Sequence, residues 1–209
     1  MTRFVLISDT HGMHDSVIIP PGDILIHAGD IGVEKYPISL FKFNSWMSDL
    51  PHKHKIVIPG NHDIWIENNL TEARNSISKF HFLICESVTV EGFKIWGTPH
   101  QPEFFDWAWN LPRGPRLAKI WAQIPEDTDV VVTHGPPAGI LDLTSHKNRM
   151  GCQDLLERLN IVHPKLHVFG HNHEGYGIQT VGKTTYVNAS SCTAKYRPIN
   201  PPIVLDLEK

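Results

Sequence analysis

The stretch Lys55-Ile56-Val57-Ile58-Pro59-Gly60-Asn61-His62-Asp63 joins an apolar run to three side chains that can carry chemistry. A short apolar run rich in β-branched residues is typical of a buried strand, so an amide, an imidazole and a carboxylate meet where that strand ends. Taken alone, the stretch fits two interpretations equally well. It is either a turn that caps a helix beginning near Ile64, or part of a functional site.

Four further segments share this arrangement, in which a β-type apolar run is followed by side chains that can bind a metal. They are Ser8-Asp9-Thr10-His11-Gly12, Ala28-Gly29-Asp30, Val132-Thr133-His134-Gly135 and Phe169-Gly170-His171-Asn172-His173. Asp9 and His11 are two residues apart, which in extended chain puts both side chains on one face. Strands that deliver such groups to one edge of a sheet predict a metal centre at that edge.

The composition is that of an ordinary globular protein. The chain has 209 residues, enough to bury a core without disulfides, and we expect one domain over residues 1–209. Hydrophobic residues make up 41% of the chain, and no apolar stretch approaches the roughly 20 residues of a membrane span. The first residues show no signal-peptide pattern and the three cysteines lack zinc-site spacing. We therefore expect a cytoplasmic protein with packing thiols.

The charge of the chain restricts its partners. The net charge is -3 and the isoelectric point is near 6.5, with no block of lysine or arginine. A protein that follows a nucleic-acid backbone needs the opposite balance, so nucleic acid is not an expected partner. Small anionic substrates are compatible with this charge. The oligomeric state is left open.

The order of the expected elements predicts an α/β fold. Amphipathic helices over residues 38–50, 117–124 and 152–159 alternate with apolar strands near residues 3–8, 24–28, 55–58, 129–132, 166–169 and 203–207. This alternation is typical of parallel βαβ units, whose ligand crevices open at the carboxyl ends of the strands. Short runs in residues 80–96 and a hairpin over residues 177–187 predict antiparallel strands as well, so a mixed sheet is expected.

Residues 98–114 are dense in aromatic residues and prolines and show no clean periodicity. Structured loops of this length are often functional. We expect Trp107, Trp109 and Arg113 to form a wall of the substrate pocket. Phe104 and Phe105 are expected to pack on the core instead.

The candidate ligands offer oxygen and imidazole nitrogen but no thiolate. Such a set suits hard to borderline divalent ions better than it suits a structural zinc site. Because seven ligands exceed what one catalytic ion with an open position needs, the pattern indicates two ions. The seven are Asp9, His11, Asp30, Asn61, His134, His171 and His173. Manganese (Mn²⁺) is the expected metal, with iron (Fe), zinc (Zn) or cobalt (Co) as the alternatives.

These motifs resemble the complete motif set of the calcineurin-like metallophosphoesterases. The set comprises Asp9-x-His11, Gly29-Asp30, Gly60-Asn61-His62-Asp63, His134 and Gly170-His171-x-His173. Each motif alone is weak, but all of them in order are highly specific. Two longer segments, residues 107–115 and 164–177, are similar to the metallophosphoesterase-domain-containing subfamily of phosphodiesterases.

The resemblance implies a fold and an assignment of ligands. The implied fold is a four-layer α/β/β/α sandwich of two mixed β-sheets flanked by helices, with a bimetal site at one edge. Asp30 would bridge the two ions. The first ion would be held by Asp9, His11 and His173, and the second by Asn61, His134 and His171.

The resemblance also implies that His62 faces the substrate phosphate without binding metal, while Asp63 orients its ring. Two cations would lower the pKa of a bridging water, so that a hydroxide can attack phosphorus in line. His62 would act as general acid, because an alkoxide leaves poorly without a proton.

The expected activity is therefore hydrolysis of small phosphodiesters, cyclic nucleotides among them. The first alternative is a phosphomonoesterase or protein phosphatase on the same scaffold. The second is a non-catalytic nucleotide-binding or scaffold protein on the same fold. The intact ligand set and His62 speak against the second, because a scaffold has no need to keep charged ligands around an empty site.

Overall fold

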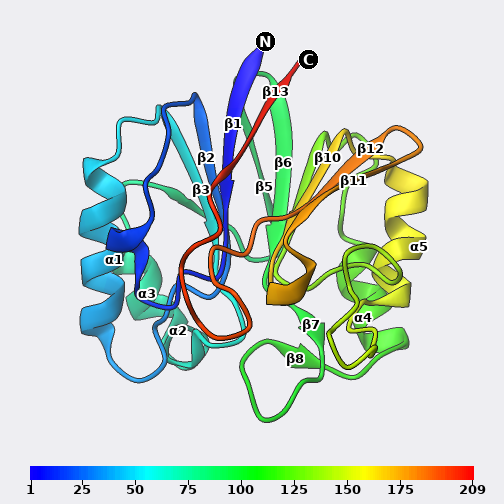
Figure 1. Cartoon of the computed structure of the whole chain (residues 1–209), viewed down its shortest axis with the longest axis horizontal. Helices are drawn as coiled ribbons and strands as arrows, with labels where there is room; N and C mark the ends of the chain where they lie inside the picture. The colour runs from blue at the N-terminus through cyan, green and yellow to red at the C-terminus, as the bar shows by residue number, and fades with distance from the viewer.

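The computed structural model describes residues 1–209 and contains two large β-sheets (Figure 1). The first sheet has the strand order β13-β1-β2-β3-β4. Its strands are β1 (Thr2–Ile7), β2 (Ile24–Ala28), β3 (His54–Ile58), β4 (His81–Phe82) and β13 (Ile203–Leu207). Strands β1 to β4 run parallel, and β13 pairs antiparallel with β1 at the edge.

The second sheet has the strand order β11-β12-β10-β9-β6-β5. Its strands are β5 (Glu86–Val90), β6 (Phe93–Thr98), β9 (Val130–Thr133), β10 (Leu166–Phe169), β11 (Gly177–Val181) and β12 (Thr184–Asn188). The central strands run parallel, and an antiparallel partner closes each edge. A separate short pair consists of β7 (Gln101–Pro102) and β8 (Asn110–Leu111).

Apolar side chains cover both faces of the central strands. In β1, Phe4 and Leu6 belong to the cluster between the sheets, whereas Val5 and Ile7 belong to the cluster under the helices of the first sheet. Because side chains alternate with a period of two, a strand buried on both faces has to be apolar throughout. The cluster between the sheets contains 18 buried residues from both sheets, so the sheets share one interior.

Helices cover the outer faces of both sheets and complete four layers (Figure 1). The helices on the first sheet are α1 (Pro37–Asp49), α2 (Ile64–Asn68) and α3 (Leu70–Ser76). Those on the second sheet are α4 (Pro115–Trp121) and α5 (Gln153–Val162). Two 3-10 turns, η1 (His14–Ser16) and η2 (His173–Gly175), lie in loops. This arrangement confirms the α/β/β/α fold class expected from the sequence.

The helices are short and amphipathic. The longest, α1, has 13 residues and buries Leu40, Phe43 and Met47 against the first sheet. Phe43 and Met47 belong to the apolar stripe Phe43, Trp46, Met47 and Leu50 that predicts this helix from the sequence, and Trp46 and Leu50 pack against the same cluster. None of the helices combines the length and the apolarity that crossing a membrane would require.

Residues 80–96 differ from the sequence-based expectation, because they divide between the two sheets. Strand β4 pairs parallel with β3 in the first sheet, with Phe82 opposite Val57. Only β5 and β6 form the expected antiparallel hairpin, at the edge of the second sheet. The hydrophobic pattern of a two-residue strand carries no information on direction, so the partner of β4 is decided by packing.

The carboxyl ends of the parallel strands meet at one edge of the molecule, at the end away from the chain termini (Figure 1). In the first sheet Ala28 pairs with Ile58, and in the second Val132 pairs with Val168. Neighbouring strands therefore end at nearly the same level. The turns that follow them lie together, at the place where α/β sheets bind ligands.

Candidate metal centre

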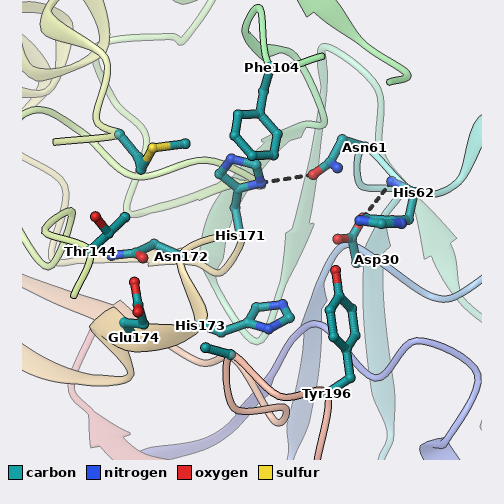
Figure 2. A pocket seen from close by; sticks show the side chains of 12 residues that line it. Asp30, Asn61, His62, Phe104, Thr144, His171, Asn172, His173, Glu174 and Tyr196 are labelled. Atoms are coloured by element: carbon teal, nitrogen blue, oxygen red, sulfur yellow. Dashed lines mark hydrogen bonds between the residues drawn. The ribbon is translucent and has the colours of Figure 1, made fainter. Parts of the chain in front are cut away.

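Each of the predicted ligands follows a strand at the shared edge of the two sheets. The first sheet provides Asp9 and His11 after β1, Asp30 after β2 and Asn61 after β3. The second sheet provides His134 after β9, and His171 and His173 after β10. Figure 2 shows four of these side chains around one hollow. The structure thus brings together all seven residues that the sequence singled out.

Asp30 connects the two halves of this cluster. Its Oδ2 lies 3.4 Å from His134 Nε2 of the second sheet and 3.7 Å from His11 Nε2 of the first. Its Oδ1 accepts a hydrogen bond from the backbone N–H of His62 at 2.8 Å. Because the side chain is only 2% exposed, both oxygens are confined between the two groups of ligands.

The first group consists of Asp9, His11 and His173. Asp9 Oδ1 lies 3.3 Å from His173 Nε2, and the Nε2 atoms of the two histidines lie 3.2 Å apart. The other ring nitrogen of His173, Nδ1, donates to the Thr193 carbonyl at 3.0 Å. That bond orients the ring so that Nε2 faces the cluster, as is usual for histidines that bind metals.

The second group consists of Asn61, His134 and His171. Asn61 Oδ1 lies 2.8 Å from both His134 Nε2 and His171 Nδ1. His134 Nδ1 donates to the Ala28 carbonyl at 2.9 Å, so this ring is oriented by a backbone carbonyl as well. Figure 2 shows the His171–Asn61 contact at the rim of the hollow.

The donor set of this second group fits a divalent cation. A neutral His134 ring uses its proton for the Ala28 carbonyl, so its Nε2 carries a lone pair. That lone pair faces the amide oxygen of Asn61 and the carboxylate of Asp30, which are acceptors too. Acceptors turned toward one another repel unless a proton or a cation lies among them. Oxygen and imidazole donors of this kind suit manganese, iron, zinc or cobalt.

Charges within the cluster set the protonation of its members. Burial would lower the pKa of His134, but the negative charge of Asp30 outweighs it and raises that pKa to about 9. Burial would raise the pKa of Asp30, but the charge of His134 holds it well below its usual range. His134 and Asp30 therefore form an ion pair. The proton on His134 Nε2 lies between this nitrogen and the oxygens of Asp30 and Asn61, where a bound cation could replace it. Burial lowers the pKa of His171 to about 3, so this ring is neutral.

The backbone at the cluster adopts conformations that cost stability. Asp9, Asp30 and His171 have φ angles of 52°, 55° and 62°, in the left-handed region that few non-glycine residues occupy. Such conformations cost about 1–3 kcal/mol each and persist only where neighbouring contacts hold them. Here the Asp9 N–H donates to the Gly29 carbonyl at 2.9 Å, and the His171 N–H donates to the Asp9 carboxylate at 3.1 Å.

Two glycines allow the turns to approach one another. A Cβ on Gly60 would overlap the backbone and carboxylate of Asp30, and a Cβ on Gly170 would overlap the carboxylate of Asp9. The close packing of these turns therefore depends on the missing side chains.

Asp63 holds the turns together, which differs from its expected role of orienting the His62 ring. Its carboxylate accepts hydrogen bonds of 2.7 to 3.1 Å from the backbone N–H groups of Ile31, Gly32, Val33 and Gly60. With four donors on its two oxygens, Asp63 joins the turn after β2 to the turn after β3. It also stands at the start of α2 but makes no side-chain cap there.

His62 lies beside the cluster, between polar and aromatic neighbours. Its Nδ1 lies 3.2 Å from Glu34 Oε1, and its ring centroid lies 4.0 Å from that of Trp107. Nε2 is therefore the ring nitrogen left free to face a substrate. Ligand atoms of His62, His11 and Asp30 also lie within 4.8 Å of one another, so the distances alone permit His62 as a ligand as well.

Two residues expected in the substrate wall lie elsewhere in the structure. Trp109 is 6% exposed and belongs to the core of the first sheet. Arg113 donates to the carbonyls of Met150 and Gly151, at 3.1 and 2.7 Å. Neither residue lines the hollow above the cluster. Tertiary packing determines which side chains of this loop face the core and which face solvent. Because the loop sequence has no hydrophobic period, it does not show this in advance.

The remaining aromatic residues of the loop also differ from expectation. Phe104, expected in the core, lines the hollow, and its ring centroid lies 5.1 Å from that of His171. Phe105 is 77% exposed. Trp107 stands beside His62, and its part in substrate binding stays a prediction.

Two residues at the site escape prediction from the sequence. The Tyr196 ring centroid lies 4.8 Å from that of His11 and 5.3 Å from that of His173. Ser190 Oγ donates to the Asp9 carboxylate at 2.8 Å. Ser190 follows β12, whose sequence Thr-Thr-Tyr-Val-Asn is not an apolar run, so the pattern that marked the other strands does not mark it. Tyr196 lies in a turn with no such signal.

Two facing mixed sheets with oxygen and imidazole ligands at their shared edge define an α/β protein of the metallophosphoesterase class. The chain belongs to the family described as Calcineurin-like phosphoesterase, whose sequence profile matches residues 2–175. Divalent metal ions are implied by this family, and the clustered histidine and aspartate groups agree with that implication.

Relatives cover nearly the whole chain. Metallophosphoesterase domain-containing protein 1 of Homo sapiens is 45% identical over 231 residues, an alignment that covers 99% of this chain and 71% of that protein. A UPF0046 protein of Caenorhabditis elegans is 35% identical over 221 residues, an alignment that covers 99% of this chain and 76% of that protein.

Solved structures show the same fold at low sequence identity. TT1561 of Thermus thermophilus superimposes with a TM-score of 0.60 at 16% identity, covering 90% of this chain and 88% of that one. GAP50, the anchor in the inner membrane complex of Plasmodium, gives a TM-score of 0.55 at 13% identity, covering 91% and 71%. At these identities the likeness concerns the fold alone.

We predict that Gly170→Ala weakens metal binding at least tenfold while the protein stays folded. The added methyl would overlap the side chains of Asp9 and Ser8, so Asp9 has to leave its place. Metal content after reconstitution with Mn²⁺ measures the effect, and circular dichroism checks the fold. Gly135→Ala is the control, because a methyl there would meet only Gln101, at 3.5 Å. Equal metal content in the two variants would contradict this account of Gly170.

Proposed function

We propose that the chain is a dinuclear-metal-dependent phosphoesterase that hydrolyses small phosphodiesters, cyclic nucleotides among them. The observation that carries the proposal is the convergence of ligands from both sheets on Asp30, beside an open hollow. Membership of the Calcineurin-like phosphoesterase family supports hydrolysis of phosphoric esters. The proposal treats residues 1–209 as one catalytic unit.

The two groups of ligands would each hold one divalent ion, with Asp30 shared between them. Asp9, His11 and His173 would hold the first ion, and Asn61, His134 and His171 the second. The donor set suits manganese, iron, zinc or cobalt, and manganese is the metal that we expect. When bound, such ions offset the negative charge of a phosphoryl group and activate water.

His62 would supply the proton that bond cleavage needs. Water adds to phosphorus, the ester P–O bond breaks, and its electron pair goes to the leaving oxygen. We assign His62 Nε2 as the donor of a proton to that oxygen, since Nδ1 contacts Glu34. The proton released by the attacking water passes to solvent. General acids of this kind contribute typically 10²–10⁴ in rate.

The charge around the site supports diesters over monoesters. Glu174 lines the hollow above the cluster, Asp106 lines the neighbouring hollow, and Glu34 contacts His62. Neither hollow is lined by a lysine or an arginine. The two ions would attract the phosphate of either ester. Near neutral pH a monoester carries a second negative charge, which the carboxylates around the ions would repel, whereas a diester carries only one.

We predict that the Mn²⁺-reconstituted protein hydrolyses bis-p-nitrophenyl phosphate at least tenfold more efficiently than p-nitrophenyl phosphate. The reason is the repulsion of the monoester dianion by the carboxylates around the site. Release of p-nitrophenolate, followed by absorbance, gives kcat/KM for both substrates. Faster hydrolysis of the monoester would favour a phosphomonoesterase or protein phosphatase. No hydrolysis of either would favour a non-catalytic protein.

We also predict that His62→Ala lowers kcat for a 3′,5′-cyclic nucleotide by about 10²–10⁴, and kcat for bis-p-nitrophenyl phosphate far less. A ribose hydroxyl needs a proton to leave, whereas p-nitrophenolate leaves without one. Metal content should be unchanged. Loss of an interaction made in the transition state appears mostly in kcat.

The control for this variant is His81→Ala, which removes an exposed histidine of β4 at a distance from the site. Equal losses on both substrates would make His62 a charge-stabilising group instead of a proton donor. A fall in bound metal would make it a ligand.

A further inference from the structure

Two hollows open beside the ligand cluster and share a wall. The polar hollow lies above the cluster and has a volume of about 210 Å³. The aromatic hollow lies next to it and is wider, at about 600 Å³. His62, Phe104 and Tyr196 line both hollows, so these residues form the ridge between them.

The aromatic hollow is lined mainly by ring side chains. Beside the ridge residues it is lined by Ile64, Phe105, Asp106 and Trp107. Phe105 is 77% exposed and lies 4.6 Å from Phe104 between ring centroids. Exposure of a phenylalanine ring to water is unfavourable. With other rings around it beside the site, Phe105 offers a surface on which a flat group can stack. Asp106 adds one hydrogen-bond acceptor to these apolar walls.

The far side of the polar hollow has a different character. Figure 2 shows Thr144, Asn172 and Glu174 on the side opposite His62, with the ligands in between. Asn172 is 4% exposed, and its side-chain N–H groups donate to the carbonyls of Leu141 and Leu143. These three residues give this side of the hollow polar groups and no aromatic ring.

A phosphodiester bound across the ridge would place one arm in each hollow. Its phosphorus would lie over the ligands, and its two ester oxygens would point to opposite sides. His62 belongs to the ridge, and its ring packs against Trp107 of the aromatic hollow, at 4.0 Å between centroids. An ester oxygen on the aromatic side would therefore lie beside the His62 ring. Proton donation from His62 would then favour departure of the arm in the aromatic hollow.

We propose that the aromatic hollow binds the departing arm of the substrate, and that this arm is a nucleoside. The stacking surface suits a nucleobase, and the Asp106 carboxylate suits an N–H group at its edge. This inference rests on the proposed function. In the step, the oxygen of water bonds to phosphorus, the P–O bond to the nucleoside breaks, and the nucleoside oxygen takes its proton from His62. The arm in the polar hollow keeps the phosphate.

The test uses adenosine 5′-(methyl phosphate), whose two arms are both poor leaving groups. The Mn²⁺-reconstituted protein should release adenosine and methyl phosphate in at least tenfold excess over adenosine 5′-phosphate and methanol, as counted by chromatography. Phe105→Ala and Trp107→Leu should each reduce this ratio several-fold. Phe41→Ala, which removes a phenylalanine of α1 that is 48% exposed, is the matched control and should leave it unchanged.

Release of adenosine 5′-phosphate as the main nucleoside product would overturn the inference, as would an equal change of the ratio in all three variants. If adenosine 5′-(methyl phosphate) is hydrolysed too slowly for products to be counted, an inhibition assay tests the inference instead. It measures how adenosine inhibits the hydrolysis of bis-p-nitrophenyl phosphate. Adenosine should then inhibit competitively, and Phe105→Ala should raise the inhibition constant several-fold. No inhibition would overturn the inference but leave the diesterase function standing. Failure to hydrolyse bis-p-nitrophenyl phosphate itself would remove the proposed function.

Discussion

The Asp30 carboxylate, held between histidines of two different β-sheets, is the contact on which the architecture of the site depends. Asp30 lies 3.4 Å from His134 across the sheets and 3.7 Å from His11 within its own sheet. The two sheets share one apolar interior, so this contact is made at the end of a rigid sandwich rather than between mobile parts. A buried carboxylate needs positive partners, and here the partners are themselves metal-binding groups. The Asp30–His134 contact therefore joins the two sheets at this edge, and a metal ion bound between the two side chains could take its place.

The positions of the candidate metal ligands could be predicted from the sequence because each follows a recognisable strand. Apolar runs such as Val130–Thr133 and Leu166–Phe169 are buried on both faces, and parallel strands end at a common edge. Once those strands are located, the polar residues after them have to meet. The four-layer fold follows from the same pattern, since strands with two apolar faces require a layer on each side.

The parts that could not be predicted depend on contacts distant in sequence. Asp63 was expected to act on the neighbouring His62 ring, but four backbone donors from two turns occupy its carboxylate. Trp109, expected at the pocket, lies in the core, and Phe104, expected in the core, lines the hollow. The loop that carries them has no hydrophobic period to show which side faces the core. Tyr196 reaches the ligands from a turn near the end of the chain, with no pattern to mark it. The positions of these side chains depend on which residues become buried and on where the chain turns back. Both are determined only when the whole fold has formed.

The central claim, that ligands of both sheets meet at Asp30 to hold two ions, is tested most directly by counting metal. The measurement is bound Mn²⁺ per chain, by elemental analysis after reconstitution and removal of free metal, for the wild type, Asp30→Asn and the exposed control Asp106→Asn. We predict about two ions for the wild type and for Asp106→Asn, and a loss of both ions for a folded Asp30→Asn. A wild-type protein without metal, or an Asp30→Asn protein that retains both ions, would contradict it.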